Sequence, residues 1–443
     1  MGVRLLAVQV PLPDGQGDWR FDPDEWPDPA GMVAELGDLG VKLMVSIWPT
    51  VNPASENYQE MRDLGLLVAA EHGVPVQLSI WDKGPAGQAA VSFYVQPPCP
   101  HAVGVVAVPD LPPQVGARPR VRGVRMRARD GAREARQRAL PPRARPQGGT
   151  AEHRAGIQAA GAPALGDRRR LLPLDEVGNI YPLLHAQGFH DAMRCGGEDE
   201  VLSLARSAWA GSQRYGTVIW SGDIGPTFEA LRRQIPAGLN IGLSGIPWWT
   251  TDIGGFKGGD ISSPSFRELI VRWFQFGVFS PICRLHGARQ PFRMVDGELT
   301  GAANEVWSFG EREYEILRRL LFLRERLRPY VMAQMRIAHE SGLPPMRPLF
   351  LNHPADQTSW EVEDQFLLGD DLLVAPVTHE GARQREVYLP AGATWRDAWT
   401  GVQCRGGGWV TAPAPLDTIP VYVREGGRAE PFGPFGALGG DTG

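Results

Sequence analysis

One carboxylate stands out by its position as a candidate for acid–base chemistry. Residues 218–231 read VIWSGDIGPTFEAL, in which an apolar run ends at Trp220 and a turn of small residues carries Asp223. A carboxylic acid held protonated near neutral pH can protonate a poor leaving group as its bond breaks. We expect burial beside Trp220 to favour this neutral form by desolvating the charge. The alternative is a carboxylate that interacts with the N-terminal dipole of the following helix.

The segments around Asp223 indicate a parallel α/β fold. Stretches 41–48, 74–81 and 217–220 are apolar, rich in β-branched residues and bounded by turn residues, which is typical of buried strands. We expect a helix to run from Thr227, as its N-cap, to about Ile235. Strand, polar loop and helix in alternation favour a barrel with its site at the carboxyl ends of the strands.

Further elements are expected towards the C-terminus. Residues 239–256 should form another strand followed by a glycine-rich loop, and residues 277–287 a strand that ends at His286. A long amphipathic helix is expected from about Glu311 to Ser341. After about Pro354, short apolar runs separated by Gly, Pro and Asp indicate an antiparallel β-sandwich.

Composition limits the class of protein. The net charge of −5 gives no reason to expect nucleic acid as a partner. The four cysteines are widely spaced, which argues against a zinc site or a disulfide framework. No apolar run approaches the roughly 20 residues of a membrane span, and residues 1–12 do not resemble a secretory signal, so the expected location is cytoplasmic. We expect no cofactor and no metal. The sequence leaves open whether the chain forms a homo-oligomer.

One segment, 95–170, departs from this pattern. From His101 to Arg170, 46 of 70 residues are Ala, Arg, Gly or Pro, and 15 of these are Arg. Three interpretations compete: a basic disordered insertion that binds nucleic acid, a solvated linker, or an out-of-frame translation of GC-rich DNA. The chain has 42 arginines but only three lysines, which indicates GC-rich DNA and favours the third interpretation.

The stretch 206–256, RSAWAGSQRYGTVIWSGDIGPTFEALRRQIPAGLNIGLSGIPWWTTDIGGF, resembles glycoside hydrolase family 31, a family of retaining α-glucosidases and α-xylosidases. The resemblance continues in RWFQFGVFSPICRLHG at 272–287, upstream in 17–29 and 41–68, and downstream in 360–377. It implies a (β/α)8 TIM barrel followed by a C-terminal antiparallel β-sandwich. The family's N-terminal sandwich and first barrel strands are not in the sequence, so the barrel is expected to be incomplete.

The resemblance also assigns roles to individual residues. Asp223, in the W-x-G-D motif, matches the general acid/base. The expected substrate-binding residues match positions in the same pocket: Trp48, Trp81, Arg206, Trp220, Asp252, Phe256 and His286. Arg206 would clamp a sugar hydroxyl or a carboxylate, and His286 would hydrogen-bond the sugar. Aromatic rings at strand ends suit the apolar faces of sugars.

The nucleophile is missing from its expected place. A retaining glycosidase needs a second carboxylate about 5 to 5.5 Å from the acid. The family places it in a W-L-D-x-x-E-P strand, where this chain reads RVRGVRMRARDG at 120–131. The family pattern returns at 176–194, in register, as paired frameshifts would produce. Asp110 and Asp130 lie in the segment without the motif, so the nucleophile remains unknown.

These observations predict five segments and two main functions. The segments are the N-terminal part of the barrel at 1–94, the aberrant and disordered 95–170, the rest of the barrel at 171–355, the sandwich at 356–430 and a disordered tail at 431–443. The first function is a retaining α-glycosidase of α-xylosides or α-glucosides, inactive or nearly so in this chain for lack of a nucleophile. The alternative is a catalytically dead remnant that binds carbohydrate.

Overall fold

The computed structural model describes most of the chain outside 95–177. The described residues are 4–9, 17–18, 21, 23–24, 26–46, 50–63, 67–70, 77–79, 90–93, 107–108, 155–158, 171–173, 178–295, 298–429 and 435. They fall into two compact units. One comprises residues 5–95 and 108–178, and the other residues 1–4, 96–107 and 179–443.

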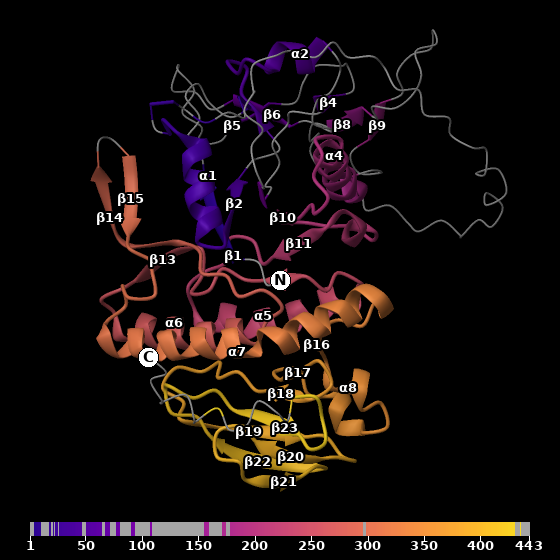
Figure 1. Ribbon diagram of the computed structural model, residues 1–443, viewed down its shortest axis with the longest axis vertical. Coiled ribbons are helices and arrows are strands. Elements are labelled where there is room, and N and C mark those ends of the chain that lie inside the picture. The colour runs from indigo at the N-terminus through magenta and orange to yellow at the C-terminus, as the bar shows by residue number, and fades with distance from the viewer. Residues whose placement is uncertain are drawn as a thin grey trace, which may run out of the picture. The chain divides into compact units, whose positions relative to one another are not determined.

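The described residues of the first unit form short strands and the helices α1 and α2 (Figure 1). Helix α1 (Pro29–Asp38) begins with proline at its first position, and Asp28 Oδ1 accepts a hydrogen bond of 2.9 Å from the amide of Gly31. Helix α2 spans Tyr58–Asp63. The expected strand at 41–48 is present as β2 (Val41–Ser46). Of the stretch 74–81 the structure describes residues 77–79, which form the strand β5 (Gln77–Ser79).

Three small sheets organise the strands of this region. Their orders are β1-β2-β7, β3-β6-β5 and β4-β8-β9. The strands not yet bounded are β1 (Arg4–Gln9), β3 (Thr50–Val51), β4 (Ala69–Ala70), β6 (Ala90–Phe93), β7 (Ala107–Val108), β8 (Ala155–Gln158) and β9 (Leu171–Pro173). Of the segment 95–170, expected to be disordered, the structure describes only β7 and β8.

The second unit opens with parallel strands and helices. Strands β10 (Ser203–Ala205), β11 (Thr217–Trp220) and β12 (Trp249–Thr250) pair in parallel in that order. Helix α4 (Tyr181–Cys195) and the 3-10 turns η1 (Gly178–Ile180) and η2 (Ser212–Tyr215) precede β11. A parallel bridge between Ile253 and Leu285 follows β12. These pairings agree with the expected strand-and-helix alternation.

Helix α5 (Phe228–Leu243) is capped as expected but is longer than expected. Thr227 Oγ1 accepts a hydrogen bond of 3.1 Å from the amide of Ala230. The helix continues through Pro236, because Leu239 packs into the same core as Ile235. The strand expected within 239–256 is therefore limited to β12, and the first part of that stretch is helix.

The strand expected within 277–287 is also corrected. Gly277 and Val278 end helix α6 (Pro264–Val278), and Leu285 contributes only a single bridge. Helix α6 is buried from Leu269 to Val278, because the core also includes side chains of helix α7 and of the sandwich. An apolar run without a polar face cannot be assigned to helix or strand by its period. The hairpin strands β14 (Ala288–Val295) and β15 (Glu298–Ala302) follow, and β14 also pairs with β13 (Lys257–Asp260).

Helix α7 (Glu311–Ser341) has the bounds that its amphipathic pattern predicts. Its buried positions recur three or four residues apart, for example at Ile316, Leu320, Leu323 and Leu327. In Figure 1 it runs alongside helix α6, above the C-terminal strands, and one apolar core contains residues of all three. Helix α7 therefore joins the barrel part of this unit to the sandwich.

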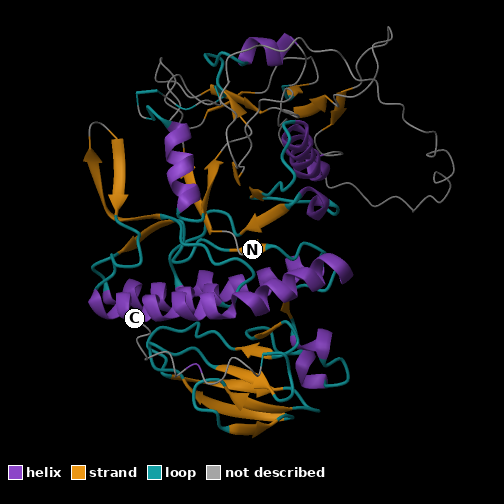
Figure 2. Ribbon diagram, viewed as in Figure 1, coloured by secondary structure: helices purple, strands orange, loops and turns teal. Residues whose placement is uncertain are grey.

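The C-terminal region is an antiparallel sandwich, as expected (Figure 2). A six-stranded sheet has the order β16-β17-β18-β23-β20-β21, and β19 pairs with β22. The strands are β16 (Met346–Arg347), β17 (Phe366–Leu368), β18 (Leu372–Val374), β19 (Gln384–Leu389), β20 (Thr394–Asp397), β21 (Gln403–Arg405), β22 (Gly408–Pro413) and β23 (Val421–Arg424). Two short helical elements, α8 (Leu349–Asn352) and η3 (Gln357–Trp360), precede β17.

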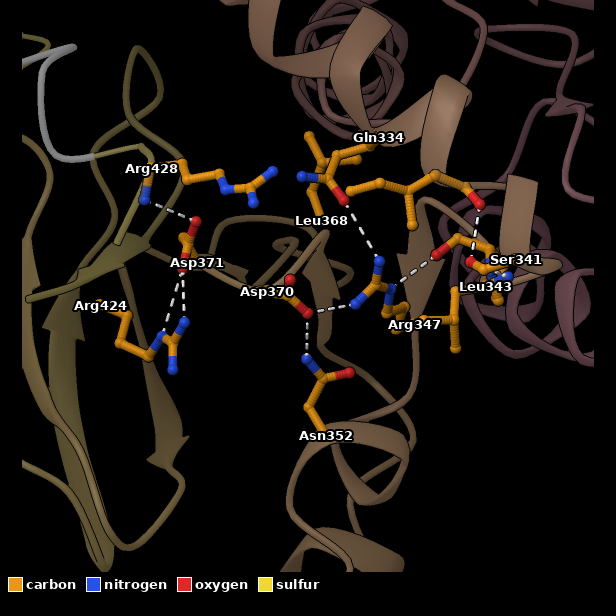
Figure 3. A network of polar contacts seen from close by, with 12 residues as sticks. Gln334, Ser341, Leu343, Arg347, Asn352, Leu368, Asp370, Asp371, Arg424 and Arg428 are labelled. Atoms are coloured by element: carbon orange, nitrogen blue, oxygen red, sulfur yellow. Dashed lines mark hydrogen bonds and ion pairs between the residues drawn. The ribbon is translucent and has the colours of Figure 1, made fainter. Parts of the chain in front are cut away.

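Two neighbouring aspartates fix the junction between β17 and β18 (Figure 3). Buried Asp371 accepts hydrogen bonds of 2.9 Å from Arg424 Nη2 and from the amide of Arg428. Asp370 forms an ion pair with buried Arg347, whose Nη2 also donates to Gln334 of α7 at 3.2 Å. The sandwich is thus tied to α7 by polar contacts as well as by its core.

The C-terminal tail is described at one position. Of residues 431–443, expected to be disordered, the structure describes only Phe435. Its buried ring lies 6.2 Å from that of Phe279 and 5.3 Å from that of Trp399, measured between centroids. Within the described ranges, no helix has the length and apolar character needed to cross a membrane.

Candidate active site

The candidate residues of the second unit lie at the carboxyl ends of its parallel strands. Arg206 directly follows β10, Asp223 lies three residues after β11, and Asp252 lies two residues after β12. His286 follows Leu285, which forms the parallel bridge to Ile253. Because carboxyl ends of parallel strands meet at one edge, the fold gathers residues that are up to 80 positions apart in sequence.

Asp223 is paired with Arg206. The distance between Arg206 Nη2 and Asp223 Oδ1 is 2.6 Å, and the side chains are 58% and 44% exposed. The guanidinium carbon of Arg206 lies 5.6 Å from the centroid of the Trp220 ring. The expectation that burial beside Trp220 desolvates Asp223 is therefore wrong: the carboxylate is half-exposed and contacts a cation. Trp220 instead supports the arginine.

Asp252 is the buried carboxylate of this site. It forms an ion pair with Arg284, whose guanidinium carbon lies 5.9 Å from the centroid of Trp220. Burial raises the pKa of Asp252 to about 6, although the positive charge of Arg284 opposes the shift. Its Oδ2 atom is buried and has no hydrogen-bond partner among the described residues. Asp252 is fully buried, so a ligand cannot reach this oxygen unless the surrounding side chains move.

His286 is held neutral at pH 7. Burial lowers the pKa of its imidazole to about 4, and the positive charges of Arg284 and Arg289 act in the same direction. The ring stacks on Phe256, with centroids 5.7 Å apart and planes 22° from parallel. A neutral imidazole has one donor and one acceptor nitrogen, which suits a hydroxyl group as partner.

The loop that carries Asp252 and Phe256 approaches the His286 loop very closely. A Cβ atom at Gly287, where φ is 135°, would lie 2.6 Å from the carbonyl oxygen of Gly255. Buried Arg289 holds the two loops together by donating to the carbonyl groups of Ile253 at 2.9 Å, Gly255 at 2.7 Å and His286 at 3.2 Å. Glycine is therefore required at 287 for this approach.

The sequence does not single out Arg284 or Arg289. Arg284 is the first residue of the RLHG motif and Arg289 lies two residues after it, but 42 arginines hide any signal from residue type alone. Their position beside His286 was the available clue. Trp48 and Trp81 lie outside the described residues, as do Asp110 and Asp130. In the described part of the chain, no group of three or more His, Cys, Asp or Glu residues could hold a metal ion.

The opposite pKa shifts of His286 and Asp252 predict a measurable pH dependence of stability. Because His286 has a folded pKa of about 4 and an unfolded value near 6.5, unfolding takes up a proton between these values, so the free energy of unfolding falls with acidification. Asp252, with a folded pKa of about 6, has the opposite effect between pH 6 and about 4.

Between pH 7 and pH 5 the free energy of unfolding should fall in both proteins. We expect the fall to be about 1–2 kcal/mol smaller in His286→Gln than in the unmodified chain. The reason is that glutamine cannot take up the proton when the chain unfolds. Urea unfolding at pH 7, 6 and 5 measures the difference, with Asp252→Asn as the control of opposite sign. Parallel pH profiles for all three proteins would contradict the prediction.

Two family models match the chain. The model described as the TIM-barrel domain of glycosyl hydrolases family 31 matches residues 7–111 and 127–334. The model described as the C-terminal domain of the same family matches residues 342–427. The parallel strands and the antiparallel sandwich described above therefore correspond to a TIM-barrel domain and its C-terminal domain, as predicted.

Individual relatives give the same result. An uncharacterized family 31 glucosidase of Pseudescherichia vulneris is 41% identical over 62% of this chain and 45% of its own length. An alpha-xylosidase of Saccharolobus solfataricus is 29% identical over 93% of this chain and 49% of its own. A crystal structure of a family 31 alpha-xylosidase from a soil metagenome, complexed with xylose, has a TM-score of 0.77 and 41% identity, over 97% of this chain and 59% of that one. The chain thus spans about half the length of these curated relatives.

Proposed function

Because the chain belongs to glycoside hydrolase family 31, we propose that its site is that of a retaining α-glycosidase for terminal α-xylosides or α-glucosides. The observation that carries the proposal is the gathering of Asp223, Arg206, Asp252 and His286 at the carboxyl ends of parallel strands. The xylose in the related crystal structure supports a pentose as the ligand. A free glycoside is the partner that this site fits.

The residues of this site would fill every role in a double displacement except that of the nucleophile. Asp223 would donate its proton to the leaving oxygen and later remove a proton from water. The neutral His286 would bind a sugar hydroxyl group, and buried Asp252 would hold Arg284 in place beside Trp220. Arg206 would have to exchange its contact with Asp223 for one with the sugar before Asp223 can act as an acid. The nucleophile of the first displacement is not identified.

We further propose that the chain has little or no turnover. The reason is the sequence at 120–131, RVRGVRMRARDG, where the W-L-D-x-x-E-P motif is expected. A sugar bound beside Asp223 would then lack a nucleophile on its opposite face. A small anion can replace a missing carboxylate: azide attacks the anomeric carbon, the glycosidic C–O bond breaks, and the leaving group takes the proton of Asp223. This single displacement inverts the configuration and gives a β-glycosyl azide.

The test uses the phenyl and 2,4-dinitrophenyl glycosides of α-xylose and α-glucose as substrates for the purified chain. Release of the phenol is measured without azide and with azide at about 1 M. We expect near-background release without azide and clear release with it, and NMR should identify the β-glycosyl azide. Turnover without azide that gives the α-sugar would show that the chain contains its own nucleophile, and would overturn the second proposal alone.

The alternative, a remnant that binds carbohydrate without catalysis, is distinguished in the same series. It predicts no release with or without azide but measurable binding of xylose or glucose by calorimetry. The site supports this alternative through Trp220, Arg206 and His286, which can bind a sugar without a nucleophile. Absence of both release and binding would overturn the α-glycosidase proposal itself.

A further inference from the structure

The outer face of the β19–β22 pair carries an aromatic platform beside hydrogen-bonding side chains. In this antiparallel pair, Tyr388 lies opposite Trp409 and Glu386 lies opposite Thr411. Because alternate residues of a strand share a face, these four side chains lie on the same side of the pair. Trp409 is 54% exposed. Thr411 Oγ1 donates a hydrogen bond of 2.6 Å to Glu386.

The platform is held rigidly. The ring of Trp409 lies 5.3 Å from that of Tyr388, measured between centroids. The Tyr388 hydroxyl group lies 2.8 Å from each carboxylate oxygen of Asp356, to which it donates. The amide of Ala391 also donates to Asp356 at 2.8 Å. Asp356 therefore connects the β19–β22 pair to the turn η3, which begins at the next residue.

A second exposed tryptophan lies at the end of this turn. Trp360 is 54% exposed and stacks on Phe350, with centroids 4.5 Å apart and planes 8° from parallel. Its indole Nε1 donates a hydrogen bond of 3.0 Å to the carbonyl group of Pro354. One face of the indole is thus covered and its only donor is used. The ring is fixed, so a ligand that stacks on its other face need not immobilise it.

We propose that these residues form an accessory binding surface for an oligosaccharide chain, separate from the site of Asp223. We define the Trp409 surface as the exposed side chains Trp409, Glu386, Thr411 and Trp360. Tyr388, which is 4% exposed, and Asp356 lie beneath it as supports. A sugar ring has an apolar C–H face and hydroxyl groups at its edge, which match fixed aromatic rings beside carboxylate acceptors. An apolar peptide would instead bury the charge of Glu386, which is unfavourable. The choice of α-linked glycan rests on the proposed function.

Native gel electrophoresis of the full chain in gels that contain soluble xyloglucan or amylose tests the proposal. Saturating free xylose in the gel keeps the Asp223 site occupied. We expect the polysaccharide to retard the chain, and Trp409→Ala and Trp360→Ala each to raise the dissociation constant by about tenfold or more. Trp409→Phe, which keeps a flat ring, should retain part of the retardation. Trp307→Ala is the matched control, because Trp307 is 66% exposed but lies outside this surface.

The possible results separate this inference from the proposed function. Equal retardation of Trp409→Ala, Trp360→Ala and the unmodified chain would overturn the Trp409 surface, as would an equal loss in Trp307→Ala. Absence of retardation for both polysaccharides would do the same. Xylose binding by calorimetry reports on the Asp223 site alone. Retardation that depends on Trp409 without xylose binding would support the surface while contradicting the proposed catalytic site.

Discussion

Asp223→Asn is expected to slow the azide-dependent release of phenol from phenyl α-xyloside by about 10²–10⁴-fold. Phenol is a poor leaving group, so its departure needs a proton from Asp223. The same variant should affect 2,4-dinitrophenyl α-xyloside much less, because dinitrophenolate leaves without protonation. The asparagine keeps the shape of the side chain and can still contact Arg206, which lies 2.6 Å from Asp223 in the unmodified chain.

A control of the same chemistry is available on the following helix. Glu229, in the first turn of α5, is an exposed carboxylate paired with Arg232 and Arg233, so Glu229→Gln also replaces a paired carboxylate by an amide. It should leave both rates unchanged. An equal loss for the two leaving groups in Asp223→Asn would assign Asp223 to substrate binding rather than to proton transfer. No loss for either would remove it from the mechanism.

Arg272→Met is expected to lower the free energy of unfolding by about 3–5 kcal/mol. Arg272 lies on α6 and is fully buried. Its terminal nitrogens donate to four carbonyl groups of the sandwich, at distances of 2.8 to 3.1 Å: Ala382, Ala414, Pro415 and Thr418. Burial lowers its pKa to about 10, so it stays charged at pH 7. Methionine fills a similar volume but leaves the four carbonyl groups without this donor.

Urea unfolding at pH 7 followed by circular dichroism measures this effect. The matched control is Arg312→Met on α7, because Arg312 is exposed and the same side chain is removed. The control should change the free energy of unfolding by less than about 0.5 kcal/mol. A change below about 1 kcal/mol in Arg272→Met would mean that water replaces the guanidinium at these carbonyl groups. The link from α6 to the sandwich would then rest on apolar packing alone.

Buried arginine is a recurrent means of joining segments in this chain. Partly buried Arg324 of α7 donates to the carbonyl groups of Val278, the last residue of α6, and of Ser280 and Pro281 beyond it. Arg289 does the same for the loops of the candidate site. A guanidinium group offers five donors in a planar fork, so it can satisfy several carbonyl groups where chain segments converge. The sandwich and the site therefore depend on the same type of contact.

The sequence by itself determined the elements whose signals are local. The period of three to four residues placed α7 at Glu311–Ser341, and Thr227 is recognisable as an N-cap from its own type and position. The alternating strands and turns after Pro354 predicted the antiparallel sandwich, and the long motifs around Asp223 identified the family. Each of these signals lies within one continuous stretch of the sequence, so no distant contact is needed to read it.

Only the tertiary structure decided features that depend on distant partners. The last residues of α5 and of α6, which lie in the stretches 239–256 and 277–287, were expected to be strand. They are helix because their apolar side chains pack against segments that are distant in the sequence. Parallel strand pairing brings distant loops together, and this decides which arginines are buried. It also leaves Asp223 half-exposed beside Arg206 and buries Asp252 beside Arg284. Burial and charge pairing arise from segments far apart in the sequence, so neither can be read from local pattern.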